Sequence, residues 1–246
     1  MIPKKIHYIW VGGSEMPELI KKCIESWKKF CPDYEIIRWD ESNLDINKFK
    51  YAADAYVNKK WAFFLDVHRF DILKTHGGIY LDVDVELCKS LDEYLDCEFF
   101  SGFENSNYVN PGLIMGSIKE CSVCQDIVAK YEQMTFNPNR LVTVCKIATK
   151  YLQDKYGLID DETTQKFGNK VHIYSPDYFC PKRDESGKFC VTDKTVSIHH
   201  YLASWAGKAT IITKIKLKIK SFIKKIIGKK NVEKIREKRD KKLGID

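Results

Sequence analysis

The sequence lacks the features of an exported, membrane-spanning or disulfide-stapled protein. No apolar segment follows the charged start of the chain, so a signal peptide is not predicted. No window holds about 18 consecutive apolar residues, so no membrane-spanning helix is expected. The nine cysteines are odd in number and have no framework spacing, which favours reduced thiols in a cytosol. The one CxxC pair, Cys121 and Cys124, lacks two further ligands at zinc-site spacing, so we expect plain, partly buried thiols.

Excess positive charge is absent from most of the chain, although the formal net charge is +7. Residues 208–246 hold 13 Lys and 2 Arg against 2 Glu and 2 Asp, a net charge of +11, so residues 1–207 carry −4. This asymmetry predicts two parts, an acidic globular body over 1–207 and a basic tail over 208–246. The tail therefore points to an anionic partner.

The tail carries an amphipathic pattern between Ile211 and Ile227. At 100° per residue, all its apolar residues except Leu217 fall on one face, and most of its lysines fall on the other. The stretch 214–220 also alternates like a strand, but the length of the pattern favours a helix. A basic helix of this kind is expected to lie in an anionic membrane interface. The alternative is that its apolar face packs on the body or on a second subunit.

The body reads as an α/β fold with a mostly parallel sheet. A strand over 6–10, a helix opened by Pro17 and ending before Pro32, and a strand over 34–39 form a β-α-β unit. The further expected elements are a helix over 61–76 closed by Gly77, strands over 79–86, 98–103 and 112–117, helices over 121–133 and 141–156, and strands over 171–174 and 197–200.

Two aspartates, Asp82 and Asp84, follow the Gly77-Gly78 pair on the strand expected over 79–86. On a continuous strand they would share one face, where two carboxylates repel each other unless a cation neutralises them. Hard oxygen ligands suit Mg²⁺ or Mn²⁺, which bind through one or two carboxylates and substrate phosphates. The alternative is that both simply face solvent on an amphipathic strand.

Asp66 and Arg69 lie three residues apart on the helix expected over 61–76, so they share a face. They could form a local ion pair of little consequence. They could instead bind a substrate, Asp66 through a sugar or ribose hydroxyl and Arg69 through sugar or phosphate oxygens. The residues alone leave both interpretations open.

These segments together resemble glycosyltransferase family 32, sugar transferases with a DXD motif. The resemblance rests on the segments 2–13, 26–28, 33–35, Asp66-x-x-Arg69 and 77–84, and on Ile198-His199-His200-Tyr201-x-x-Ser204-Trp205. The first hundred residues are also similar to the glucosyltransferase domain of the large clostridial toxins. Two departures are Leu65, where the family commonly has Ser, and the weakly matching segment 110–112, which usually shapes the acceptor site.

The resemblance implies a GT-A fold, a Rossmann-like sheet with a nucleotide-sugar and a divalent metal, and net retention at the anomeric carbon. The site residues that it implies are Trp10 stacking on the nucleobase, Asp66 and Arg69 on the donor sugar, Tyr80 against the nucleotide, Asp82 on the ribose and metal, Asp84 on the metal, His199 or His200 completing the metal shell, and Ser204 and Trp205 on the diphosphate. Catalysis is expected to depend on Asp84, Asp82 and Arg69.

The sequence thus predicts a retaining hexosyltransferase that uses Mn²⁺ or Mg²⁺ and a nucleotide-sugar, with a UDP-sugar favoured over a GDP-sugar. The acceptor is expected to be a lipid-linked glycan in surface polysaccharide synthesis, with the enzyme cytoplasmic and peripheral on the inner face of the membrane. The alternatives are a protein acceptor, as in a toxin or effector, a sugar-nucleotide-binding pseudoenzyme, and a basic nucleic-acid-binding protein. The last would need neither aspartate, and the acidic body speaks against it, so no nucleic-acid partner is expected.

Overall fold

A computed structural model of the chain describes residues 1–104, 107–184 and 186–202. Residues Met1–Leu202 form one compact unit. The amphipathic helix predicted within 208–246 and the domain boundary predicted at 207 lie outside the described residues. Within the described part of the chain, no helix combines the length and the apolar character needed to cross a membrane.

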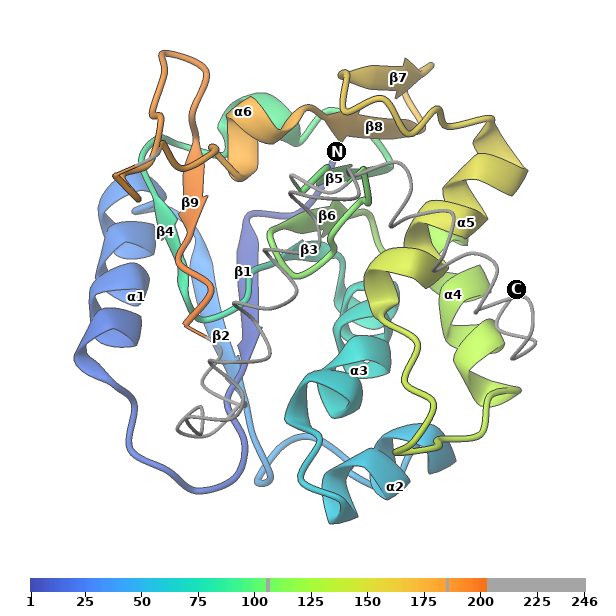
Figure 1. The fold of residues 1–246 in the computed structure, drawn as a ribbon. Helices are drawn as coiled ribbons and strands as arrows, with labels where there is room; N and C mark the ends of the chain where they lie inside the picture. The colour runs from blue at the N-terminus through green and yellow to red at the C-terminus, as the bar shows by residue number, and fades with distance from the viewer. Residues whose placement is uncertain (105–106, 185, 203–246) are drawn as a thin grey trace. The chain divides into compact units, whose positions relative to one another are not determined.

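The core of the unit is a seven-stranded sheet with the order β2-β1-β3-β6-β5-β8-β7 (Figure 1). Its strands are β1 (Lys5–Ile9), β2 (Glu35–Trp39), β3 (Gly78–Tyr80), β5 (Phe99–Gly102), β6 (Met115–Ser117), β7 (Gln165–Phe167) and β8 (Val171–Tyr174). The pairs β1/β2, β1/β3 and β5/β8 are parallel, whereas β6 and β7 run antiparallel to their neighbours. Five strands therefore run one way and two the other, which confirms the mostly parallel sheet.

Helices cover both faces of this sheet. They are α1 (Glu18–Phe30), α2 (Lys50–Val57), α3 (Trp61–His76), α4 (Ser122–Glu132), α5 (Val144–Tyr156) and the short α6 (Pro176–Phe179), with a 3₁₀ turn, η1 (Asp92–Tyr94). Figure 1 shows α3 beside the sheet, with α2, α4 and α5 around it, and α1 near the opposite edge of the view. Helices α2 and α6 and strand β7 were not among the expected elements.

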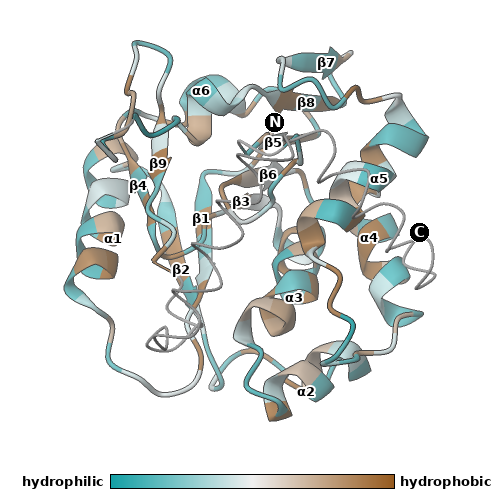
Figure 2. Cartoon of the chain, viewed as in Figure 1, coloured by the Kyte–Doolittle hydropathy of each residue, from teal (hydrophilic) through white to brown (hydrophobic). Residues whose placement is uncertain are grey.

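Two separate apolar cores lie on the two faces of the sheet. Ile79 belongs to the core on the α1 face and Tyr80 to the core on the α3 face. Phe100 and Phe99 divide in the same way, because successive strand residues point to opposite faces. On α1 the buried residues are Ile20, Cys23 and Trp27, a helical spacing that leaves the outer face polar, and Figure 2 shows brown and teal segments side by side on this helix.

Helix α3 is buried on nearly all sides, since it contacts the sheet on one side and α2 and α4 on the other. It ends at Gly77, whose φ of 63° lies in the range that favours glycine. A Cβ at this position would lie 2.9 Å from the Lys119 backbone nitrogen. The helix and its glycine stop match the sequence prediction, and the burial of α3 places its polar residues Asp66 and Arg69 inside the protein.

The strand expected over 79–86 is wrong in its continuity. Strand β3 ends at Tyr80, residues 83 and 84 form a turn, and β4 (Val85–Leu87) pairs with β9 (Ser197–His199) in a separate two-stranded sheet. The backbone leaves the main sheet because the N–H of Asp82 donates to the Gly112 carbonyl, and the N–H of Val85 then donates back to the Asp82 carbonyl at 3.1 Å. A turn, and not one face of a strand, therefore positions Asp82 and Asp84.

None of the nine cysteines, all of which lie in the described part of the chain, forms a disulfide. Cys121 and Cys124 are both buried at the start of α4, where Cys121 is the N-cap residue. The Cys124 thiol donates to the Ser117 hydroxyl at 3.4 Å. The pair therefore packs in the interior, as a small apolar residue does.

Candidate active site

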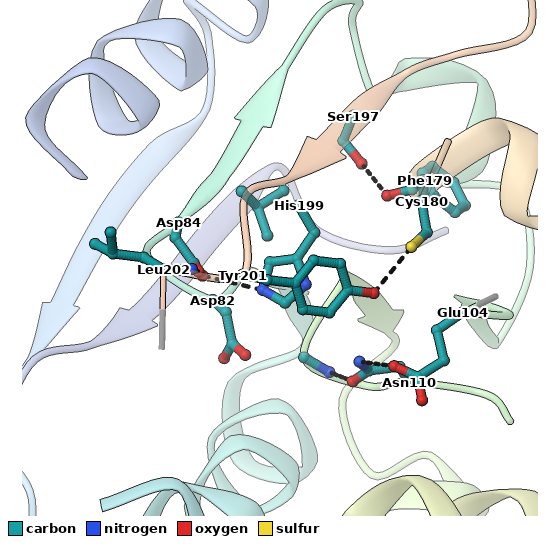
Figure 3. Close-up of polar contacts among 12 residues, drawn as sticks. Asp82, Asp84, Glu104, Asn110, Phe179, Cys180, Ser197, His199, Tyr201 and Leu202 are labelled. Carbon is teal, nitrogen blue, oxygen red and sulfur yellow. Dashed lines mark hydrogen bonds and ion pairs between the residues drawn. The ribbon is translucent and has the colours of Figure 1, made fainter. Parts of the chain in front are cut away.

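Asp82, Asp84 and His199 come together beyond the carboxyl end of β3 (Figure 3). Each offers one ligand atom, and these atoms all lie within 4.8 Å of one another. The turn after β3 supplies both carboxylates, and the antiparallel pairing of β4 with β9 sets Val85 opposite His199. Residues more than 100 positions apart thus meet at one end of the main sheet.

Both carboxylate oxygens of Asp84 are already held, one by the last residue of β9 and the other by the segment that follows it. The Nε2 of His199 lies 3.0 Å from Oδ1, and the backbone N–H of Leu202 donates to Oδ2 at 2.7 Å. The N–H of His200 also donates to the Asp84 carbonyl at 3.0 Å. Burial raises the pKa of Asp84, but the hydrogen bond with His199 and the Leu202 N–H outweigh it, so the pKa lies below its usual range. Asp84 is therefore ionised at neutral pH.

The Asp82 carboxylate lies on the other side of the turn, against a buried charge cluster. The Arg69 guanidinium lies 3.5 Å from Asp82 Oδ1 and 3.6 Å from Asp66 Oδ1. Asp66 and Arg69 are each only 4% exposed. Burial raises the pKa of Asp66 to about 7 and also raises that of Asp82, in both cases against the attraction of Arg69. One guanidinium can balance only one of these carboxylates, so the cluster favours a further cation or a proton.

Tyr80 is fully buried beneath Arg69, whose guanidinium carbon lies 5.1 Å from the centre of the tyrosine ring. This geometry is a cation–π contact in the interior. The resemblance implies that Tyr80 lies against the nucleotide. In the structure its ring is 1% exposed and supports Arg69 from below.

The loop before β6 closes tightly over Asp82. A Cβ on Gly112 would lie 2.4 Å from Asp82 Oδ2 and 2.8 Å from a guanidinium nitrogen of Arg69, so only glycine fits here. Asn110 shapes this loop, since its Oδ1 accepts a hydrogen bond from the Gly112 N–H at 2.8 Å and its Nδ2 donates to Glu104 at 2.9 Å. Glu104 was not a sequence candidate, and Asn110 was named only within the segment 110–112, which the family resemblance associates with the acceptor site; the Asn-Pro-Gly run also indicates a turn there.

Trp10 follows the carboxyl end of β1, at the same edge of the sheet as Asp82, because β1 and β3 are parallel neighbours. Its backbone N–H donates to the Trp39 carbonyl, and its indole N–H donates to the Ser14 carbonyl at 2.9 Å. The side chain is partly buried, so the ring is held in one orientation with part of its surface in solvent.

The two histidines of the pair point in different directions. His199 contacts Asp84, whereas the Nε2 of His200 lies 2.8 Å from Glu86 Oε2 and its ring stands edge-on to Phe189. His199 is the last residue of β9, and His200 follows the strand. The structure therefore brings His199 to the two aspartates and does not bring His200. Ser204 and Trp205 lie outside the described residues.

His7 on β1 fixes the start of the segment that carries the aspartates. Its Nε2 lies 2.9 Å from the Gly77 carbonyl, and its Nδ1 lies 3.1 Å from the indole nitrogen of Trp39. The indole can only donate, so Nδ1 accepts and Nε2–H donates. Burial lowers the pKa of His7 to about 4, which keeps the ring neutral. This contact was not expected from the sequence.

The three residues fit a divalent cation. Among the described residues, Asp82 Oδ1 and His199 Nδ1 are buried without a hydrogen-bond partner, which is unusual unless a further group satisfies them. Two carboxylates and one imidazole suit Mn²⁺ or Mg²⁺ with water and phosphate filling the remaining positions. Asp82, Asp84 and His199 are thus the residues that would hold it.

Comparisons with known proteins agree with this geometry. Residues 17–100 match the family described as a glycosyltransferase sugar-binding region containing a DXD motif. The uncharacterized glycosyltransferase L373 of Acanthamoeba polyphaga mimivirus is 30% identical over 223 residues, which cover 84% of each chain. The chain belongs to the DXD-motif glycosyltransferase family.

Two further likenesses cover less of the chain. Inositol phosphoceramide mannosyltransferase 3 of Schizosaccharomyces pombe is 37% identical over 101 residues, 38% of this chain and 27% of the relative. The structure of the PaToxG glycosyltransferase superposes with a TM-score of 0.50 at 21% identity, over 63% of this chain and 70% of that one. At that identity the likeness shows the fold alone, and it confirms the predicted GT-A architecture.

Proposed function

We propose that this glycosyltransferase transfers a hexose, with retention, from a UDP-sugar to a glycan acceptor in a reaction that needs a divalent cation. The observation that carries the proposal is the meeting of Asp82, Asp84 and His199 next to the buried Asp66–Arg69 pair. A nucleotide-sugar offers a diphosphate for a cation and hydroxyls for a carboxylate and a guanidinium. These two halves of the site are complementary to the two halves of the donor.

The protein groups then take distinct roles in binding the donor. Trp10 stacks on the nucleobase with its solvent-exposed surface. Asp66 and Arg69 bind hydroxyls of the donor sugar, and Asp82 binds the ribose and the cation. Because Tyr80, Gly112 and the Asp66 carboxylate surround Arg69, its guanidinium is pre-organised and needs little reorganisation when the donor binds.

The cation itself supplies Lewis-acid stabilisation of the negative charge on the departing diphosphate. Asp84 is suited to bind the cation, since the carboxylate is ionised at neutral pH and its position is fixed by His199 and Leu202. Arg69 adds a positive charge beside Asp82. We assign no enzyme nucleophile, and propose substitution on the same face of the anomeric carbon through an oxocarbenium-like transition state, with Arg69 contributing to charge stabilisation.

For the acceptor we propose a lipid-linked glycan in surface polysaccharide synthesis, reached at the inner face of a membrane. This part is supported by the sequence alone. The segment 208–246 has a net charge of +11 and a basic amphipathic pattern, and such segments bind anionic lipid surfaces. Ser204 and Trp205 are proposed to hold the diphosphate, again from the resemblance.

The catalytic proposal is tested with Asp84→Ala. Turnover of a panel of UDP- and GDP-sugars is measured with Mn²⁺, with Mg²⁺ and after EDTA treatment. We expect EDTA to abolish turnover, Mn²⁺ or Mg²⁺ to restore it, and Asp84→Ala to lose at least about a hundredfold in turnover, as removal of a central electrostatic group does. The matched control is Asp126→Ala on α4, which should keep full activity. Activity of Asp84→Ala within tenfold of wild type would sink the assignment.

The membrane proposal has its own experiment. Full-length protein and a chain ending at residue 207 are sedimented with neutral and with anionic vesicles. Binding of the full-length chain to anionic vesicles alone, lost in the shorter chain and weakened by salt, supports it. Equal behaviour of the two chains contradicts it and returns weight to a protein acceptor.

A further inference from the structure

Tyr201 adopts a backbone conformation that few residues other than glycine take. Its φ is 53°, in the left-handed region, where a residue with a Cβ is held only if its surroundings favour the strain. The strain lies between two residues that bind Asp84, His199 by its ring and Leu202 by its N–H. The conformation therefore places the tyrosine ring at the edge of the candidate active site.

The ring of Tyr201 is anchored at two points and exposed elsewhere. One face packs on His199, with the ring centres 4.1 Å apart and the planes tilted by 49°. The hydroxyl lies 3.0 Å from the Cys180 sulfur at the end of α6. Even so, the residue is 48% exposed, one of the larger values for an apolar or aromatic residue in the described part of the chain. A fixed aromatic surface therefore faces solvent beside the proposed cation ligands.

Polar groups lie next to this surface. In Figure 3 the Glu104–Asn110 pair lies on the side of the tyrosine hydroxyl, away from Asp84. The Glu104 carboxylate lies near enough to Tyr201 to interact with it electrostatically. Asn110 accepts from the Gly112 N–H, and the Gly112 carbonyl accepts from the Asp82 N–H, so this polar pair and the proposed cation site are joined by hydrogen bonds.

This combination has the chemistry of a sugar subsite. A pyranose presents an apolar C–H face and an edge of hydroxyls, and small-molecule sites pair an aromatic surface with a few placed polar groups. The donor sugar is proposed to lie with Asp66 and Arg69 on α3, and in Figure 3 α3 lies on the other side of Asp82 from Tyr201. The surface at Tyr201 thus remains for a second sugar.

We propose that Tyr201 is the stacking residue of the acceptor subsite, and that Glu104 accepts hydrogen bonds from hydroxyls of the same sugar ring. The acceptor is then a glycan whose terminal pyranose is recognised directly. This inference rests on the proposed function, because it takes the Asp66–Arg69 side for the donor.

The competing role for Tyr201 is to position His199. In that case Tyr201 would affect cation binding and not sugar binding. Two measurements separate the roles. Mn²⁺ affinity is measured by calorimetry, and binding of methyl β-glucopyranoside, methyl β-galactopyranoside and methyl α-mannopyranoside is measured by saturation-transfer NMR. The variants are Tyr201→Ala, Tyr201→Phe and, as a matched control, Tyr156→Ala, which removes a partly exposed ring on α5.

We expect the wild type to bind at least one glycoside and Tyr201→Ala to bind it at least about tenfold more weakly, as the loss of an aromatic anchor does. Tyr201→Phe keeps the ring and should stay within threefold, and Mn²⁺ affinity should be unchanged in both. Unchanged Mn²⁺ binding also shows that the variants are folded. Absence of glycoside binding by the wild type, equal binding by Tyr201→Ala, or a parallel loss of Mn²⁺ affinity overturns the proposal.

The outcome is independent of the catalytic proposal. If the wild type and Asp84→Ala both bind a glycoside through Tyr201 but the wild type turns over no sugar-nucleotide, the sugar subsite stands and the proposed transferase mechanism fails. If turnover is metal-dependent but glycoside binding does not depend on Tyr201, the mechanism stands and this inference fails.

Discussion

Asp82 and Asp84 are two residues apart and of the same type, yet they lie in opposite electrostatic environments. Asp84 accepts hydrogen bonds on both oxygens, and its pKa is lowered. Asp82 has one oxygen without a hydrogen-bond partner in the described part of the chain, shares one guanidinium with Asp66, and has a raised pKa because it is buried. The difference arises from their neighbours alone.

The comparison shows a division of labour within the motif. The Asp84 carboxylate is held in position without a cation, since protein donors already bind both of its oxygens. The Asp82 side carries more buried negative charge than Arg69 can balance, so it gains most from a cation. A metal ion would thus be placed by one aspartate and would relieve the charge imbalance around the other.

The largest expected effect comes from removing the Arg69 guanidinium, which Asp66 and Asp82 share. Arg69→Met leaves the buried Asp66 and the partly buried Asp82 without this positive partner, and we expect a loss of roughly 3–5 kcal/mol in the free energy of unfolding. Urea unfolding measures it. The control is Arg38→Met, which breaks the ion pair of the exposed Arg38 with Asp40 and should cost less than about 1 kcal/mol. Equal losses for the two variants would show that Arg69 does not neutralise buried carboxylate charge in this cluster.

The pH dependence of stability sharpens the same comparison. Burial raises the pKa of Asp66 to about 7, so between about pH 4 and pH 7 the folded state binds more protons than the unfolded state, whose aspartate titrates near 3.9. The free energy of unfolding should therefore fall as the pH rises through this window. Asp66→Asn cannot ionise, so the wild type should lose roughly 2–4 kcal/mol relative to it between pH 4 and pH 7.

This measurement is made by urea unfolding in EDTA, because a bound cation would hold the carboxylates ionised. Asp126→Asn, at an exposed ion pair with Lys155, serves as the control and should keep the wild-type profile. Parallel profiles for wild type and Asp66→Asn would contradict a raised pKa at Asp66.

The smallest expected effect separates the two histidines beside Asp84. His199→Gln should weaken Mn²⁺ binding at least about tenfold, as the loss of a supporting ligand does. His200→Gln should leave it within about threefold, since His200 contacts Glu86 and not the aspartates. Calorimetric titration of both variants at one pH gives the answer. A larger loss for His200→Gln would reverse the assignment of the two residues.

Local sequence signals identified much of the fold and part of the site. The spacing of apolar residues and the glycine after it gave the bounds of α3, and β8 was expected at its observed residues. The i, i+3 relation of Asp66 and Arg69 also held, because helical geometry fixes it whatever the helix packs against. The burial of that pair was not foreseen, since it depends on α2, α4 and the sheet closing around α3.

Non-local packing decided what local patterns left open. The segment 79–86 has a strand pattern throughout, yet it divides after Tyr80 because the Gly112 carbonyl captures the Asp82 N–H and β9 captures β4. Strand β6 runs antiparallel to its neighbours, and no residue pattern within β6 predicts this direction. Partners far along the chain made both choices.

By itself, the sequence determined the residue types, their helical and strand periods, and the Asp-x-Asp motif after a glycine stop, because these depend on neighbours within a few positions. Only the tertiary structure decided which histidine reaches Asp84, why Asp82 and Asp84 differ in pKa, and that Tyr201, Glu104 and Asn110 share one edge of the site. The physical reason is that desolvation and hydrogen bonding act between groups that meet only when the chain is folded.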